Sequence, residues 1–165
     1  MMLKEFSPLT PAEQQAMFDA IPLITILVAG ADGEIDEAEL AEAQRLTDIR
    51  TYDSHSRLLA YYELIKNNLF ERIQTMASEL PQDLEARQAV ITEELSKING
   101  ILTKLSLPFG YLYYHSFTTF AKYIAEAHGG FLRFMTISGE EAEVMTLPMI
   151  DAVERPSKVD FPDLP

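Results

Sequence analysis

The chain has 165 residues, of which 47% are hydrophobic and 24% charged, and its 26 acidic and 13 basic residues give a formal net charge of −13. A chain of this length forms one domain that buries roughly 70% of the surface exposed in the unfolded form. Excess acid repels phosphate backbones, which excludes nucleic acid as a partner. The absence of cysteine excludes disulfides, thiolate metal sites and cysteine nucleophiles.

The sequence shows no export signal or membrane span. Its N-terminus lacks the basic start and following apolar run of a signal peptide. The longest apolar run, residues 21–29, is about half the length of the roughly 20 residues that cross a bilayer, and it predicts a core helix. We therefore expect a cytoplasmic protein without membrane insertion, whose partner is another protein or a second copy of the chain.

Two helices are predicted in the first third of the chain. Thr10 and Glu13 match a capping box at the start of a helix over residues 11–31, and Gly33 is its expected stop. A cap at Asp36 begins the second helix. The expected buried side of the second helix consists of Leu40, Ala43, Leu46 and Ile49.

Two long apolar stripes predict the third and fourth helices. The third helix covers residues 54–77, and the fourth covers residues 84–105 after a break at residues 80–81. The stripe of the third helix consists of Leu58, Tyr62, Ile65, Leu69, Ile73 and Met76. The stripe of the fourth consists of Leu84, Gln88, Ile91, Leu95, Ile98, Leu102 and Leu105. Stripes of this length favour side-by-side packing, so we predict a central antiparallel hairpin.

The last third of the chain predicts an aromatic helix, a short helix and a tail. The aromatic helix begins at Pro108 and ends at residues 128–130, and a second capping box at Ser138 and Glu141 starts the short helix. Three prolines in residues 151–165 predict an extended or disordered tail after a helical domain over residues 1–150. No sustained alternation predicts a strand. The expected fold is an all-α, single-domain helical bundle.

The strongest candidate site lies within residues 27–40, LVAGADGEIDEAEL. If Gly33 takes the sixth position of a calcium loop, then Asp32, Asp36 and Glu39 take the fifth, ninth and twelfth. The first and third positions hold valine and glycine, which supply no side-chain ligand. A standard calcium site therefore cannot be built from this loop alone.

The same residues also match the start of a helix. Asp36 is a suitable N-cap, and Glu39 is the third helical residue that completes a capping box. Ile35 and Leu40 stand where a hydrophobic staple closes around the cap. Two interpretations stay open: a capped turn without metal, or weak binding of a divalent cation such as Ca²⁺ or Mg²⁺ by Asp32, Asp36 and Glu39.

The turn also carries a short signature with a partial counterpart later in the chain. The first copy consists of Ala29, Ala31, Asp32, Gly33, Ile35 and Glu39. The second consists of Ala125, Ala127, His128, Gly129 and Gly130, followed by Ser138 and Glu141. This arrangement resembles the TerB-like family of small all-helical tellurite-resistance domains, whose signature occurs in each of two related halves.

The resemblance implies two pseudo-repeated helix–turn–helix halves and a role in tellurite or general stress responses. It also implies divalent-cation binding at the acidic turn, which carries this role onto Asp32, Asp36 and Glu39. The second half departs from the family pattern because His128 replaces the aspartate and residues 130–137 lengthen the turn. The resemblance therefore implies no second acidic site.

No catalytic motif is present in the sequence. None of His55, His115 and His128 has a glutamate three residues earlier, as a di-iron bundle requires, and we expect His55 and His115 to cap or to pack. Adjacent carboxylates at 93–94 and 140–141 point in different directions on a helix, so they do not converge on a substrate. We predict a non-enzymatic domain. The alternative is a metal-dependent enzyme of unknown reaction with an acidic site between the two halves.

Overall fold

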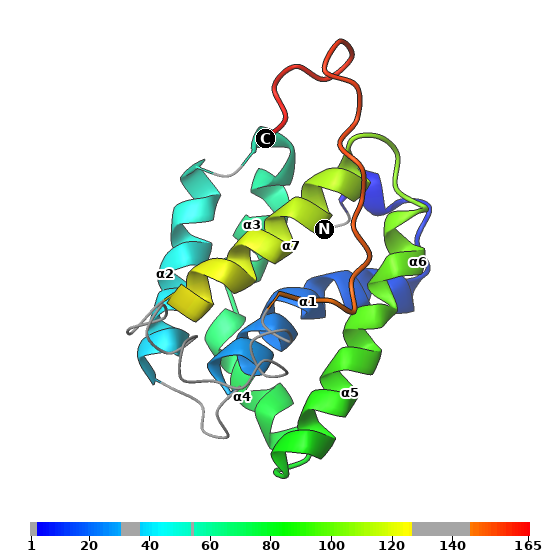
Figure 1. Ribbon diagram of the computed structural model, residues 1–165. Coiled ribbons are helices and arrows are strands. Elements are labelled where there is room, and N and C mark those ends of the chain that lie inside the picture. Colours follow the sequence, from blue (N-terminus) through cyan, green and yellow to red (C-terminus); the bar gives the residue numbers. More distant parts are fainter. Residues whose placement is uncertain (1–2, 31–36, 54, 127–145) are drawn as a thin grey trace.

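The computed structural model describes residues 3–30, 37–53, 55–126 and 146–165 (Figure 1). In these ranges the regular elements are all helices, which pack on one another in one bundle, and no strand occurs. The α-helices are α1 Pro11–Ala29, α2 Glu37–Asp53, α3 Leu59–Lys66, α4 Leu69–Glu79, α5 Leu84–Ser96, α6 Ile98–Leu102 and α7 Phe109–Glu126. Short 3-10 helices cover Lys4–Phe6 and Ser56–Leu58. The predicted all-α, single-domain bundle is confirmed. Within the described helices, none is long and apolar enough to cross a membrane.

The central helix of the bundle is α1. The predicted capping box starts it: the Thr10 amide donates to Glu13 at 2.9 Å, and the Glu13 amide donates to the Thr10 hydroxyl at 3.2 Å. Its second half, residues 20–29, is buried on all sides, and α2, α4, α5 and α7 pack against α1. A helix that is apolar all round belongs in a core, which confirms the interpretation of residues 21–29.

The end of α1 differs from the prediction. The helix stops at Ala29 with Gly30 as its C-cap, two residues before the expected end at residue 31 and before the expected stop at Gly33. Glycine fits this place because a Cβ on Gly30 would lie 2.8 Å from the carbonyl oxygen of Ile26 and 2.9 Å from a guanidinium nitrogen of Arg87. The missing Cβ of Gly30 therefore allows the Arg87 side chain to approach the end of the helix closely.

The third predicted helix is interrupted, although its stripe is correct. Residues 54–77 were expected to form one helix, but the 3-10 helix, α3 and α4 replace it, with breaks before Leu59 and at residues 67–68. Asn68 has φ −139°, which is outside the helical region, and asparagine has a low helix propensity. All six predicted stripe residues are buried.

The fourth predicted helix is also divided. Lys97 separates α5 from α6 with a tight turn, in which its amide donates to the carbonyl of Glu94 at 3.3 Å. The break precedes Gly100, which lies inside α6. A short turn joins α4 to α5, and both helices pack on α1 as they diverge (Figure 1). The two arms of this hairpin therefore have α1 as their common partner.

A cluster of aromatic rings fills the core between α1, α3 and α7. Tyr61 has no exposed surface and contacts the rings of Phe6, Phe18, Tyr113 and Phe117. Its hydroxyl donates to the Met17 carbonyl at 2.7 Å. The Tyr113 hydroxyl donates to Glu5 at 2.7 Å, and the Tyr62 hydroxyl is hydrogen-bonded to Ser116. Each of these buried tyrosines therefore has a partner for its polar atom, as burial requires.

Residues 151–165, which the sequence predicts to be extended or disordered, form no helix and pack back onto the bundle (Figure 1). The segment before them is fixed by Asn99, whose amide nitrogen donates to the Met149 carbonyl at 2.9 Å and whose oxygen accepts from the Asp151 amide at 2.7 Å. At the far end Leu164 is buried in the core. The second half of the predicted pseudo-repeat lies mostly at residues 127–145, outside the described residues, and stays a prediction.

Candidate functional site

The predicted acidic site falls largely outside the described residues. Asp32 and Asp36 lie there entirely, and Glu39 is placed only as a backbone position in the first turn of α2. α2 begins at Glu37, directly after the expected cap. Among the described residues, no group of three histidine, aspartate or glutamate side chains is placed to hold a metal ion. The cap and the metal interpretations both stay predictions.

A buried arginine lies where the acidic turn begins. Arg87 of α5 is 9% exposed, and its Nη2 donates to the Gly30 carbonyl at 3.0 Å. A cation at a helix C-terminus is favourable because the last carbonyls carry partial negative charge. Arg87 therefore stabilises the C-terminus of α1.

Thermal unfolding of the protein with and without a divalent cation distinguishes the two interpretations of the turn. We predict that millimolar Ca²⁺ or Mg²⁺ raises the stability by less than about 0.4 kcal/mol, the value for a cation present at its dissociation constant. Asp36→Asn should be tolerated, whereas Asp36→Ala should cost about 0.5–2 kcal/mol, because asparagine caps a helix as aspartate does. A large cation-dependent rise in Tm that Asp36→Asn abolishes would contradict this prediction.

Two adjoining hollows lie around the uncovered face of α1, with volumes of about 580 and 180 Å³. We call them together the α1 trough. Its floor consists of Ala12, Gln15, Ala16, Asp19 and Leu23. One side consists of Arg72, Met76, Glu79 and Leu80 at α4, and the other of Glu94, Lys97, Gly100, Ile101 and Lys104 at α5 and α6. The trough exists because α4 and α5 diverge and leave this face of α1 open.

Ion pairs form the rim of the α1 trough. Arg72 binds Asp19 through two nitrogens, at 3.0 and 3.1 Å, Lys97 binds Glu94 at 2.7 Å, and Lys104 pairs with Glu13. Between these pairs the floor combines the small or apolar side chains of Ala12, Ala16 and Leu23 with the polar Gln15, whose amide donates to Asp19 at 3.0 Å. A surface that combines small and apolar side chains with a polar rim is the anatomy of a protein-binding surface.

The pairing shifts the ionisation of the rim away from neutral pH. The hydrogen bond from Lys104 is the main reason that the pKa of Glu13 is lowered, and the hydrogen bond to Glu94 raises the pKa of Lys97. Asp19 raises the pKa of Arg72 in the same way. A general acid or base works best with a pKa near the operating pH, so these groups are poorly suited to proton transfer.

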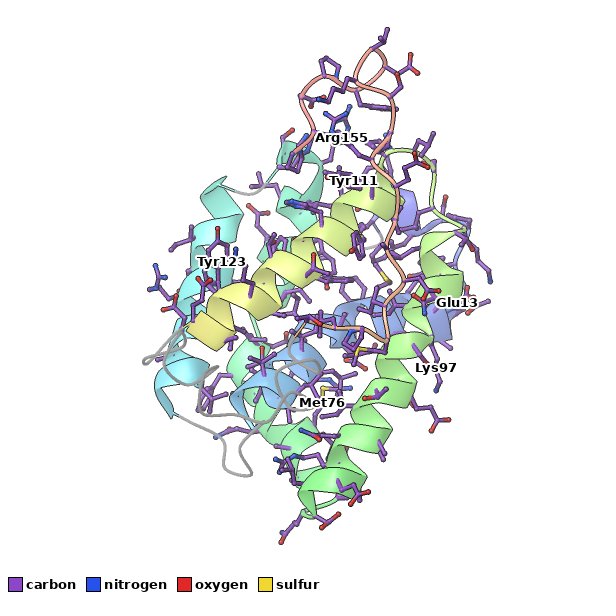
Figure 2. All side chains as sticks on the ribbon, in the orientation of Figure 1. Glu13, Met76, Lys97, Tyr111, Tyr123 and Arg155 are labelled. Carbon is purple, nitrogen blue, oxygen red and sulfur yellow. The ribbon has the colours of Figure 1, made fainter. Side chains whose placement is uncertain are left out.

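A separate cleft of about 430 Å³ lies between α2 and α7. Its lining includes His55, His115, Ser116 and Tyr123. Tyr123 is labelled on α7 in Figure 2. The rings of His115 and Tyr111 pack together with their centres 5.8 Å apart, and the hydroxyls of Ser116 and Tyr62 are hydrogen-bonded to each other. The cleft combines apolar walls with polar groups, as small binding sites do.

Both ring nitrogens of His55 are engaged. Nδ1 accepts from the Arg57 amide at 3.2 Å, which caps the 3-10 helix Ser56–Leu58, so Nε2 carries the proton that it donates to Asp163 at 3.0 Å. The capping role expected for His55 is confirmed. Neither nitrogen is free to take a proton from a substrate. Sequence reasoning missed Asp163 because it lies 108 residues away, in a segment without a pattern.

Comparison with known proteins adds no relative to these observations. No family model matches the chain, and neither the curated proteins nor the solved structures give a match. The described residues define an all-helical domain with an open trough along its central helix.

Proposed function

We propose that this protein is a non-enzymatic binding domain that takes an amphipathic helix of a partner protein into the α1 trough. The observation that carries the proposal is the uncovered face of α1 between two diverging helices. Ala12, Ala16 and Leu23 lie on its floor beside the polar side chains of Gln15 and Asp19, and ion pairs form its rim. Helix-in-groove binding uses the same arrangement, because an apolar stripe is buried while the edges stay polar.

The dimensions of the trough support a helical ligand. The floor runs from Ala12 to Leu23, which is about 17 Å along a helix axis, or three turns. Ala12, Ala16 and Gly100 present little or no side chain, so a second helix can approach α1 closely at these positions. A partner helix with apolar residues at steps of three and four would cover this length.

The net charge of the chain indicates which charge the polar face of the partner helix carries. The cations on the trough rim are paired with carboxylates, whereas the chain as a whole carries a formal charge of −13. Acidic surroundings speed the approach of a positively charged protein and slow that of an acidic one. The favoured partner is therefore a helix with one apolar face and basic flanks.

The TerB-like signature over residues 29–39 supports the proposal that the domain binds its partner as part of a cytoplasmic stress response. It also supports weak divalent-cation binding at the acidic turn. The alternative function, a metal-dependent enzyme, requires at least three converging ligands around an open position. The full engagement of His55 and the paired rim of the trough favour the binding domain.

A pair of matched substitutions tests the trough. Ala16→Arg places a long charged side chain on the floor, whereas Ala89→Arg makes the same change on the exposed side of α5. We predict that partner protein recovered by the tagged wild-type chain falls at least about tenfold with Ala16→Arg and stays unchanged with Ala89→Arg, which corresponds to a loss of about 1.4 kcal/mol or more. Equal recovery by both variants would contradict the proposal. Thermal melts establish that both variants are folded.

A further inference from the structure

The smaller hollow of the α1 trough, which we call the end hollow, has an apolar wall. Its volume is about 180 Å³, and side chains of α1 and α4 form most of its lining. The wall consists of Leu23, Met76 and Leu80, of which Figure 2 labels Met76. Leu23 and Met76 are buried and belong to the hydrophobic core, so their positions are fixed by packing. An elongated apolar group can therefore lie against a firm surface in this hollow.

The charges that line the end hollow do not balance. The carboxylates of Asp19, Glu79 and Glu94 line it, and their only counter-charge in the lining is the guanidinium of Arg72. Asp19 binds Arg72 through both of its oxygens, at 3.0 and 3.1 Å. Glu94 binds Lys97, which does not line the hollow, at 2.7 Å. Among the described residues the Glu79 side chain has neither an ion pair nor a hydrogen bond, so one carboxylate is left without a partner.

The backbone adds to the negative potential beside Glu79. This residue is the last of α4, where the final carbonyls of the helix carry partial negative charge, and the last turn of α4 contains no basic residue. Asp19 is the main reason that the pKa of Arg72 is raised, and the charge of Glu79 contributes to the same shift. A cation placed between Glu79 and the end of α4 would therefore be stabilised by both the carboxylate and the helix.

An arginine or lysine side chain matches both properties of the end hollow. Its methylene stem lies on apolar surface, while its charged head stays at a polar edge. A metal ion would gain nothing from the apolar wall. Among the described residues, moreover, no three metal-ligating side chains are placed together to hold one. The hollow therefore favours an organic cation with an apolar stem.

We propose that the end hollow is the anchor pocket for one arginine or lysine of the partner helix. The stem of this side chain lies against Met76 and Leu80, and its charged head meets Glu79 and the C-terminus of α4. The inference rests on the proposed function, because the partner helix brings the side chain to this end of the trough. A basic residue held at one end also decides which end of the partner helix lies over Leu23.

Two small compounds test the anchor pocket without the partner. N-propylguanidinium has the stem and the charged head of arginine, and N-propylurea has nearly the same shape without the charge. We expect N-propylguanidinium to shift the Met76 methyl resonance saturably and to bind about threefold or more tightly than N-propylurea. Glu79→Gln should remove this preference, whereas Glu63→Gln, the same change at an exposed position of α3, should preserve it. No saturable shift, equal affinity for the two compounds, or a preference that survives Glu79→Gln would overturn the anchor pocket.

Recovery of the partner protein separates this inference from the proposed function. Glu79→Lys should lower the recovery about threefold or more, because a lysine there repels the basic anchor, and Glu63→Lys should leave it unchanged. Lysine suits the last turn of a helix, so the Glu79→Lys chain should fold, which thermal melts establish. Recovery that falls with Ala16→Arg but not with Glu79→Lys would overturn the anchor pocket and keep the proposed function. Recovery that neither variant changes would overturn both.

Discussion

Replacing Tyr61 with alanine is expected to lower the free energy of unfolding by about 3–5 kcal/mol, because it removes a fully buried aromatic side chain and leaves a cavity. The ring is central to the aromatic cluster, and it contacts Phe6, Tyr113 and Phe117. A loss of this size is a large part of the 5–15 kcal/mol that stabilises an ordinary domain. Urea denaturation followed by circular dichroism measures it.

Two controls separate the ring of Tyr61 from its hydroxyl and from a general effect of removing tyrosine. Tyr61→Phe keeps the packing but leaves the Met17 carbonyl without this donor, which should cost about 1–3 kcal/mol. Tyr123→Ala removes a half-exposed ring from α7 and should change the stability by much less. A Tyr61→Ala protein as stable as Tyr123→Ala would show that the described core is wrong.

Replacing Arg87 with methionine is expected to cost about 1.5–3 kcal/mol, the usual range for a hydrogen bond made by a charged group. Methionine keeps an unbranched apolar stem of similar reach, while the Gly30 carbonyl loses its donor in a buried place. The matched control is Arg45→Met, because Arg45 is exposed and pairs only with nearby Glu42 among the contacts described for it. Exposed pairs of this kind contribute about 0.2–1 kcal/mol. Equal losses for the two variants would contradict the role given to Arg87.

The docking of the tail should also respond to acid. A hydrogen bond from its own backbone amide, followed by that from His55, holds the pKa of Asp163 below its usual value of about 3.9. A carboxyl group whose pKa is lower in the folded state stabilises that state at higher pH and loses the effect as pH falls through the lowered value. We therefore predict that the tail stays docked at neutral pH and that its docking weakens only below about pH 4.

Nuclear magnetic resonance of the Leu164 methyl groups measures this change, because the side chain is buried only while the tail is docked. Asp163→Asn is the control, since it cannot titrate and should remove the transition. Undocking of the wild-type tail between pH 5 and 8 would contradict the assignment of Asp163 as the controlling group.

The amino-acid pattern predicted the helices where burial repeats regularly along the chain. The capping box at Thr10 and Glu13 and the buried run of residues 21–29 follow from local chemistry, and the structure confirms both. The breaks at Asn68 and Lys97 were missed because an apolar stripe continues across each of them. Periodicity indicates which face of a segment is buried, and it is insensitive to a single turn that leaves the helix.

The candidate sites depended on contacts that a local pattern does not contain. Arg87 meets Gly30 across 57 residues, Arg72 meets Asp19 across 53, and His55 meets Asp163 across 108. Each of these residues also suits an ordinary exposed position. The α1 trough arises from the divergence of α4 and α5, which depends on how both helices pack against α1. A prediction of the helices alone does not give the angle between α4 and α5.

Site-specific photo-crosslinking tests the central claim most directly, because it reports which surface a partner touches. A photoreactive amino acid at Gln15 would lie on the floor of the α1 trough, and the same amino acid at Ala89 would lie on the exposed side of α5. The proposed function predicts a crosslink from Gln15 to an amphipathic helix of one partner protein, which Ala16→Arg abolishes, and no such product from Ala89. Crosslinks of equal yield from both positions, or a Gln15 product that Ala16→Arg leaves unchanged, would contradict it.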